Sequence, residues 1–435
     1  MEKRTSGTKP LKTTAIADAC SSFPVGFSLL RREGWLFAAF YDPLRRITVA
    51  ARRDGAEEWD FFKPEGRWLP ERGRLSSITD FDSHNYLALA VDDGGHLHLS
   101  GNMHSDPLIY FRSEKPLEIS SLVPIDRMTG CAEGRVTYPI FFRGPGSELL
   151  FRYRNGESGN GVDYYNVYDL QARSWSRLLD KPLLDGEGSR NAYARLPQPG
   201  PDGRWHLVWM WRESSDCSTN HTLSYARSSD LIHWERSDGT PLPIPITLAA
   251  GEVVDPSPMK GGLINMSQDL GFDSVGRPIL VYHRYDADGH SQLFSARRET
   301  EGWVVRPLSD WAFRWEFEGQ GSISAEIGHS GPVRGGEGRL EVVYEGRQAG
   351  SGVWVLDEAT LRVLETQPPR PSLFPAELLV PTQDLAPGME VRIAAAEGAP
   401  EGKACFLRWE TLPANRDIAP GRETPPTRLE LIEVG

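Results

Sequence analysis

The sequence predicts an all-β protein, a seven-bladed β-propeller of four-stranded antiparallel blades. Short apolar runs typical of strands recur along the whole chain, whereas helical periodicity is almost absent. Turn-forming residues are abundant, with 43 Gly and 33 Pro. The runs also fall into similar units, several of them closed by a short acidic turn and a tryptophan, as expected of a radial repeat.

The first six units follow one another, each with an apolar strand, a Gly/Asp turn, a second strand and a third strand. They occupy residues 25–63, 84–112, 138–175, 193–234, 264–303 and 339–356. The closing residues Trp175, Trp234 and Trp303 recur at intervals of about 60–70 residues, which suits four-stranded blades with long loops. The turn at 228–234, Ser-Ser-Asp-Leu-Ile-His-Trp, resembles the Asp-box turn of sialidase-like propellers.

The seventh blade is expected to combine C-terminal strands, roughly 374–435, with a strand from the N-terminus. Sharing the last blade in this way removes the open sheet edges. Residues 1–435 are therefore predicted to form a single domain, and the Pro- and Gly-rich stretches 367–375 and 411–427 are interpreted as loops. The alternative is a pair of β-sandwiches, which short strands and frequent turns would also fit.

Composition excludes several classes of partner. The formal net charge is −12, which argues against nucleic acid and against a membrane surface. The four cysteines are far apart and form no CxxC pair, as expected of free thiols in a reducing compartment. The N-terminal residues lack the apolar core of a secretory signal, so we expect a cytoplasmic protein, or a secreted one if a leader was removed. A monomer is expected.

The strongest candidate for chemistry lies on a hairpin in the second unit. Two apolar runs flank the turn 92–95, Asp-Asp-Gly-Gly, which predicts paired strands. Pairing of Val91 with His96 would make the numbers of opposed residues sum to 187. His84 and His104 then reach the same open end of the hairpin. Histidine titrates near neutral pH, as proton transfer requires.

The same pairing argument, applied to the other units, gathers further polar side chains at this end of the blades. The first hairpin of each blade opens toward one face of a propeller, where ligands usually bind. The expected pocket residues besides the two histidines are Asn85, Tyr138, Arg152, Arg154, Asn191, Arg212, His221 and His283.

These residue types suit a β-elimination beside a uronate. The uronate carboxylate must be neutralised before the C5 proton is acidic enough to remove, and Arg supplies a permanent, fork-shaped cation. A neutral His or Tyr then takes the proton, and a second group protonates the departing O4. The pair His84 and His104, together with Arg154 or Arg152, provides every required part.

Metal sites are less well supported by the sequence. Cys217 and His221 are four residues apart and could begin a zinc site with His283 or His290, but no ligand spacing is closed. The turn 286–289, Asp-Ala-Asp-Gly, suggests calcium but lacks the rest of a loop motif. We expect no required cofactor and no metal among the site residues, while a structural calcium or zinc ion stays open.

Several short motifs spread over about residues 20–365 resemble one family. They are Pro24-Val-Gly-Phe27, Ser83-His-Asn-Tyr86, Ser100-Gly-Asn-Met-His104, Val136-Thr-Tyr-Pro139, Tyr153-Arg-Asn-Gly156, Ser158-Gly-Asn-Gly161, Asp185-Gly-Glu-Gly188, Thr219-Asn-His221 and Leu223-Ser-Tyr-Ala226. Together they resemble the seven-bladed propeller enzymes that act on terminal L-rhamnose-α-1,4-D-glucuronate of gum arabic and arabinogalactan-protein glycans. That family includes rhamnose–glucuronate lyases, related α-L-rhamnosidases and, more distantly, ulvan lyases.

The resemblance implies a lyase that cleaves the O4 linkage, releases rhamnose and leaves a 4,5-unsaturated glucuronate. By matching motif, His84 and His104 become the acid/base pair and Arg154 neutralises the carboxylate. Which histidine removes the C5 proton stays open. The expected partner is a rhamnose-capped, glucuronate-containing oligosaccharide or glycan.

Two alternatives remain beside the lyase. The hydrolase branch of the family uses a His immediately before the Pro-Val-Gly-Phe segment, where this chain has Phe23, a residue with no proton to exchange. This departure disfavours an α-L-rhamnosidase, which would need a substitute carboxylate on the open face. A non-catalytic glycan-binding propeller would show stacking aromatics and no dependence on both histidines.

Overall fold

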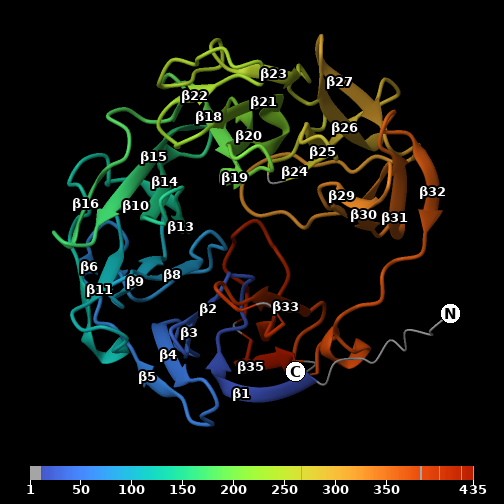
Figure 1. Ribbon diagram of the computed structural model, residues 1–435. Helices are drawn as coiled ribbons and strands as arrows, with labels where there is room; N and C mark the ends of the chain where they lie inside the picture. Colours follow the sequence, from blue (N-terminus) through green and yellow to red (C-terminus); the bar gives the residue numbers. More distant parts are fainter. Residues whose placement is uncertain (1–10, 266, 383–384, 401, 423, 435) are drawn as a thin grey trace.

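A computed structural model describes residues 11–434 except 266, 383–384, 401 and 423. In this part of the chain the strands form seven antiparallel sheets around a central axis, with one further two-stranded ribbon (Figure 1). The predicted fold class, a seven-bladed β-propeller, is confirmed. Among the described residues, regular helix is limited to three short 3₁₀ turns, Ile119–Ser121, Cys217–Thr219 and Ala376–Leu378. None of the described helices is long and apolar enough to span a bilayer.

Blades 1 and 2 follow the predicted order of strands. From the axis outward, blade 1 consists of β2 (Ser28–Arg32), β3 (Trp35–Tyr41), β4 (Ile47–Arg53) and β5 (Asp60–Phe62). Blade 2 consists of β8 (Leu87–Val91), β9 (Leu97–Gly101), β11 (Tyr110–Ser113) and β12 (Leu122–Pro124). The ribbon of β6 (Trp68–Leu69) and β7 (Arg74–Leu75) lies between them in sequence.

Blades 3 and 4 carry additional short strands. Blade 3 consists of β13 (Val136–Arg143), β14 (Leu149–Glu157), β15 (Asn160–Asp169) and β16 (Ser174–Arg177), with β10 (His104–Asp106) on β13 and β17 (Leu184–Asp185) on β15. Blade 4 consists of β18 (Asn191–Ala194), β20 (Trp205–Arg212), β21 (Asn220–Ser228) and β22 (Trp234–Glu235), with β19 (Gln198–Pro199) and β23 (Glu252–Asp255).

Blades 5 to 7 complete the ring. Blade 5 consists of β24 (Gln268–Phe272), β25 (Pro278–Tyr285), β26 (Ser291–Glu299) and β27 (Gly302–Pro307). Blade 6 consists of β28 (Ile327–His329), β30 (Arg339–Gly346), β31 (Gly350–Asp357) and β32 (Val363–Gln367), with β29 (Val333–Gly336) on β30. Blade 7 consists of β33 (Glu390–Ala395), β34 (Cys405–Thr411), β35 (Thr427–Val434) and β1 (Leu11–Ala19).

The two ends of the described chain meet in blade 7. The N-terminal strand β1 is the outermost strand of this blade and pairs antiparallel with β35, from Leu11 opposite Val434 to Ala19 opposite Thr427. This pairing joins the first strand of the sequence to the last, so the ring closes through backbone hydrogen bonds. Packing between blades adds to it: the rings of Phe27 in blade 1 and Trp409 in blade 7 lie 4.8 Å apart.

The predicted register of the blade 2 hairpin is wrong by one residue. Val91 pairs with Leu97 instead of His96, so the numbers of opposed residues sum to 188. The physical reason is the turn, in which one Asp92 carboxylate oxygen accepts from the backbone N–H groups of Gly94 and His96. Asp92 and His96 also close the turn through a backbone bond, so strand pairing resumes one residue later.

Loops between strands bring distant segments to the axis. In Figure 1 the red loop between β34 and β35, residues 412–422 and 424–426, extends from blade 7 toward the middle of the ring. Asp417 on this loop accepts hydrogen bonds from the backbone N–H and hydroxyl of Ser83, which precedes β8. The backbone N–H of Ser322, beyond blade 5, donates to the same carboxylate. One aspartate therefore ties three parts of the chain together beside the axis.

Candidate functional site

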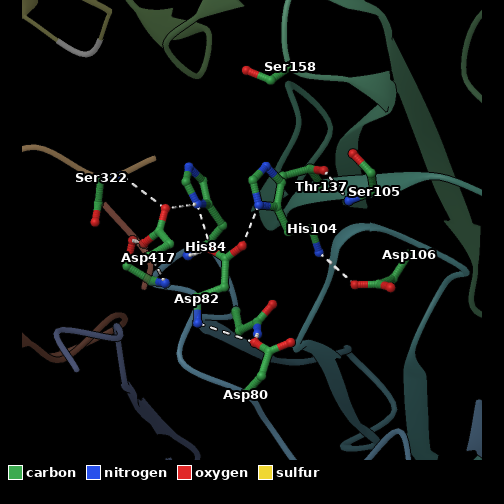
Figure 2. Close-up of polar contacts among 12 residues, drawn as sticks. Asp80, Asp82, His84, His104, Ser105, Asp106, Thr137, Ser158, Ser322 and Asp417 are labelled. Carbon is green, nitrogen blue, oxygen red and sulfur yellow. Dashed lines mark hydrogen bonds and ion pairs between the residues drawn. The ribbon is translucent and has the colours of Figure 1, made fainter. Parts of the chain in front are cut away.

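One carboxylate joins the two predicted histidines. Nδ1 of His84 lies 2.7 Å from Asp82 Oδ1, and Nδ1 of His104 lies 2.5 Å from Asp82 Oδ2. The two rings stack with their centroids 4.1 Å apart and their planes inclined by 24°. Because a carboxylate accepts, both Nδ1 atoms donate, and each ring directs Nε2 away from Asp82 toward the side where Ser158 lies (Figure 2). The pair thus presents two proton-transferring atoms in one direction.

The local backbone explains how each ring is placed. His84 lies in the loop before β8, where its own N–H donates to Asp82 Oδ1. His104 opens β10, which leaves blade 2 and pairs with β13 of blade 3 opposite Thr137. The flanking residues Asn102 and Ser105 have φ values of 62° and 60°. Such left-handed conformations are strained for non-glycine residues and are common at functional sites.

Of the two histidines, His84 is the one that also contacts a second carboxylate. Asp417 Oδ2 lies 3.4 Å from Nδ1 of His84. Burial alone would lower the pKa of His84, but Tyr138 and the carboxylates of Asp417 and Asp82 outweigh burial and raise this pKa well above its ordinary value. Burial would raise the pKa of Asp82, yet its bonds with His104 and His84 hold the pKa of this carboxyl far below its usual range. His84 is therefore the ring in which the environment most favours the charged form.

The histidine pair opens into a cavity of about 450 Å³ that also contains Tyr138, Ser158 and Arg212. A second cavity of about 690 Å³ adjoins it through Tyr138 and is lined by Arg152, Arg154 and mostly apolar groups. A pocket of this size, with few polar groups converging on it, is typical of a small-ligand site. The Nε2 atoms form no hydrogen bond with any described residue, so both are available to a ligand.

Tyr138 and Arg154 connect the two cavities. Tyr138 lies on a β-bulge of β13 and has a φ of 59°, and its ring centroid is 5.7 Å from that of His84. The guanidinium carbon of Arg154 lies 5.1 Å from the same tyrosine ring, a cation–π distance. Nη2 of Arg154 donates to Thr137 Oγ1 at 2.9 Å.

The two predicted arginines have different surroundings. Arg152 is 4% exposed and donates through Nε and Nη2 to Asp163 Oδ2, at 3.1 and 2.5 Å. Arg154 is 1% exposed, and its Nε and Nη1 atoms have no hydrogen-bond partner among the described residues. A buried cation without a paired carboxylate is costly in the free protein and favours an anionic ligand. Arg154, not Arg152, offers a guanidinium for a carboxylate that enters the cavity.

Tyr193 on β18 was not predicted as a site residue. Its hydroxyl lies 3.1 Å from Ser158 Oγ, and the guanidinium carbon of Arg212 lies 5.2 Å from its ring centroid. Burial would raise the pKa of Tyr193, but the cations of Arg154 and Arg212 lower it below the ordinary value for tyrosine. The sequence placed this residue at the start of a blade 4 strand, two positions after Asn191, which is the available signal.

The other predicted pocket residues have internal partners. Arg212 lines the smaller cavity, and its Nε donates to the backbone carbonyls of Ser214 and Asp216. Asn191 pairs with Arg212 across β18 and β20 and is 1% exposed. Asn85 is equally buried and donates to Thr79 and Asp80.

His221 and His283 lie outside both cavities. Nε2 of His221 contacts Glu213 Oε1 at 2.8 Å. His283 is fully buried, donates from Nδ1 to the Gly262 carbonyl at 2.7 Å and packs against Trp315. Burial lowers the pKa of His283 to about 4, so the ring is neutral at physiological pH. Both side chains contact other residues of the protein and do not line either cavity.

The donor atoms of Asp82, His84 and His104 lie within 4.8 Å of one another, the one such group in the described ranges. Ligands at 2.0–2.1 Å from one tetrahedral zinc ion would lie about 3.3 Å apart. The contacts of 2.7 and 2.5 Å are shorter and match hydrogen bonds from each ring to the carboxylate. This arrangement does not fit a metal held between them. Cys217 and His221 form no such group with His283 or His290.

Phe23, the residue that replaces the expected hydrolase histidine, is buried. It is 1% exposed, and its ring meets that of Phe81 edge to face at 5.8 Å. Its backbone carbonyl accepts from Thr411 Oγ1. The side chain therefore contributes to packing and offers no group for proton transfer.

Solved structures provide the comparison for the whole fold. The chain resembles the polysaccharide lyase Uly1, with a TM-score of 0.60 and 15% identity over 95% of this chain and 90% of that one. It resembles an ulvan lyase of the polysaccharide lyase family PL25, with a TM-score of 0.62 and 13% identity over 96% and 95%. A structure of the PL25 ulvan lyase bound to -[GlcA(1-4)Rha3S]- has a TM-score of 0.61 and 12% identity over the same shares.

Because the sequence identities are low, these similarities establish a shared fold and no more. A search of curated proteins by sequence found no match. The model of the BNR repeat-containing family matches residues 35–311, which is more than half of the chain and runs from β3 of blade 1 through blade 5. The chain therefore belongs to the BNR repeat-containing family.

Proposed function

We propose that this protein is a lyase that cleaves terminal L-rhamnose-α-1,4-D-glucuronate by β-elimination. The products are rhamnose and a 4,5-unsaturated glucuronate. The observation that carries the proposal is the pair His84 and His104, both held through Nδ1 by Asp82 and both directing Nε2 to one side. A β-elimination needs one group to remove a proton and another to deliver one, within reach of adjacent carbon and oxygen atoms.

Arg154 supports the first requirement, neutralisation of the uronate carboxylate. Its guanidinium is buried at the cavity wall with Nε and Nη1 unpaired. When C5 loses its proton, the negative charge delocalises into the substrate carboxylate. The guanidinium of Arg154 would stabilise that charge. One well-placed donor of this kind contributes about 3 kcal/mol to transition-state stabilisation. Tyr138, between Arg154 and His84, is placed to contact the same sugar ring.

The roles of the histidines follow from their different surroundings. His84 faces two carboxylates and is assigned as the acid that protonates O4 of the departing bond. His104 faces one carboxylate oxygen and is assigned as the base that takes the C5 proton. In glucuronate the C5–H and C4–O4 bonds lie on the same face of the ring, so elimination is syn. Two Nε2 atoms on one side of the cavity suit this geometry.

The comparisons support the class of substrate. One solved structure that resembles this chain over 96% of its length is an ulvan lyase bound to -[GlcA(1-4)Rha3S]-, a ligand that contains both glucuronate and a rhamnose derivative. Two further solved structures that share this fold are polysaccharide lyases, which supports a lyase activity for this chain. The specific linkage rests on the motifs of this chain and on the residues of its cavity.

The test is incubation with rhamnosyl-α-1,4-glucuronate while free rhamnose and ultraviolet absorbance of the conjugated uronate are followed together. Rhamnose accompanied by rising absorbance supports elimination. Rhamnose without absorbance would mean hydrolysis, the α-L-rhamnosidase alternative. Binding of the disaccharide without either product would favour a glycan-binding propeller.

A further inference from the structure

A second cluster of chemically suited groups lies on another wall of the 450 Å³ cavity. It contains Ser267, immediately before β24, Asp269 on β24 and His329 at the end of β28. Blades 5 and 6 are neighbours in the ring, and this places the three residues together although His329 follows the others by about 60 positions. The lyase mechanism uses none of them.

The three side chains contact one another in the order expected of a serine nucleophile, a histidine base and an orienting carboxylate. Ser267 Oγ lies 3.0 Å from Nε2 of His329. Nδ1 of His329 lies 3.1 Å from Asp269 Oδ2, a contact outside the angle of a directed hydrogen bond. These are the distances that a serine, a histidine and an aspartate adopt when the histidine activates the hydroxyl, and they are often looser before substrate binds.

The aspartate is held in the form that such a role needs. Arg195 donates from Nη2 to the other oxygen, Asp269 Oδ1, at 2.6 Å. Burial would raise the pKa of Asp269, but its contact with His329 and the charge of Arg195 lower the pKa below the ordinary value. The carboxylate therefore stays ionised and can stabilise a positive charge that forms on His329.

A donor for a developing oxyanion lies nearby in sequence and lines the same cavity. Oδ1 of Asn265 accepts from Asn220 Nδ2 at 3.2 Å. This fixes the amide and leaves Asn265 Nδ2 with no hydrogen-bond partner among the described residues. A side-chain amide of this kind can stabilise the oxyanion of an acyl-transfer intermediate.

We propose that Ser267, His329 and Asp269 form an esterase site that removes O-acyl groups, such as acetyl, from sugar hydroxyls bound in this cavity. Ser267 Oγ attacks the ester carbonyl carbon while its proton passes to His329 Nε2. The bond between the carbonyl carbon and the sugar oxygen then breaks, and His329 returns the proton to that oxygen. Water, deprotonated by His329, hydrolyses the acyl-serine and releases a carboxylic acid. This activity goes beyond the lyase and does not depend on it.

The first test is covalent labelling of the full-length protein with a fluorophosphonate probe, located by peptide mass spectrometry. One probe per chain is expected on Ser267. The rate should fall at least about 100-fold in His329→Gln. Ser274→Ala, which changes an exposed serine two residues beyond the end of β24, is the matched control and should label as the unchanged protein does. Absence of labelling, attachment to another serine, or equal rates in His329→Gln would overturn the proposal.

The second test is hydrolysis of 4-nitrophenyl acetate, which contains no uronate linkage, together with acetate release from an O-acetylated methyl glucuronide. Ser267→Ala should lower both rates by about 10³-fold or more. If Ser267→Ala fails to fold, the probe's attachment site on the unchanged protein still tests whether Ser267 is the nucleophile. Ester hydrolysis that persists in folded Ser267→Ala would contradict the assignment, whatever the result with the lyase substrate.

Discussion

His84 and His104 lie face to face, with their ring centroids 4.1 Å apart, and share the single carboxylate of Asp82. Two imidazolium rings at this distance would repel each other strongly in a partly buried site. The extra contact with Asp417 favours the charged form of His84. A base and an acid at the same pH are what an elimination requires.

Replacing either histidine should abolish most of the proposed lyase activity while the protein stays folded. His84→Ala and His104→Ala each remove one proton-transferring group, which is expected to lower kcat about 10²–10⁴-fold. The measurement is initial absorbance of the unsaturated product. His233→Ala is the control, because the His233 side chain is exposed on the turn 228–234 and its Nδ1 contacts Asp230. Full activity in either site variant would rule out the assigned pair.

Asp82→Asn should impair both histidines at once. An amide cannot accept from two Nδ1–H groups in the way that the carboxylate does, so at least one ring loses its tautomer and orientation. A fall in kcat on the order of 10²–10⁴ is expected, with a smaller effect on KM, since Asp82 does not itself line the cavity. A variant that changes KM alone would argue for a binding role instead.

Asp417→Asn should shift the alkaline limb of the pH profile. Without this carboxylate the raised pKa of His84 falls toward its ordinary value, so the proposed acid loses its proton at lower pH. The alkaline limb of the kcat/KM profile therefore moves to lower pH. An unchanged limb would show that His84 is not the acid.

The same substitution makes a prediction about stability. A raised pKa in the folded state stabilises the protein fully below the unfolded pKa of histidine, and this contribution is lost as pH rises through the raised pKa. Asp417→Asn should therefore lower the melting temperature more at pH 6 than at high pH, where His84 is neutral. A difference that grows with pH would contradict the assigned charge.

Arg154→Met and Arg152→Met should separate catalysis from folding. Arg154 has unpaired nitrogens, so its loss should leave the fold intact and lower kcat/KM about 10²–10³-fold. Arg152→Met leaves Asp163 buried without its partner and should cost about 3–5 kcal/mol of stability. Thermal denaturation and product absorbance, measured on both variants, check the contrast. The reverse pattern would exchange the roles of the two arginines.

The sequence by itself determined the blade pattern, because strands and turns are local. Alternating apolar runs and Gly/Asp turns are recognisable without knowledge of distant contacts, and both histidines belong to one hairpin region. The register of that hairpin was wrong by one residue because the Asp92 side chain caps the turn, a contact that depends on side-chain geometry. The end of the hairpin at which the histidines meet was unaffected.

Tertiary structure alone decided the electrostatics of the site. Asp417 lies more than 300 residues from His84 in sequence, and only closure of the ring brings its loop to the axis. Arg152 and Arg154 are two positions apart on one strand, and strand periodicity cannot distinguish them. Pairing with Asp163 neutralises the first and leaves the second for a ligand, because a buried cation needs a counter-charge that only a neighbouring strand or a substrate can supply.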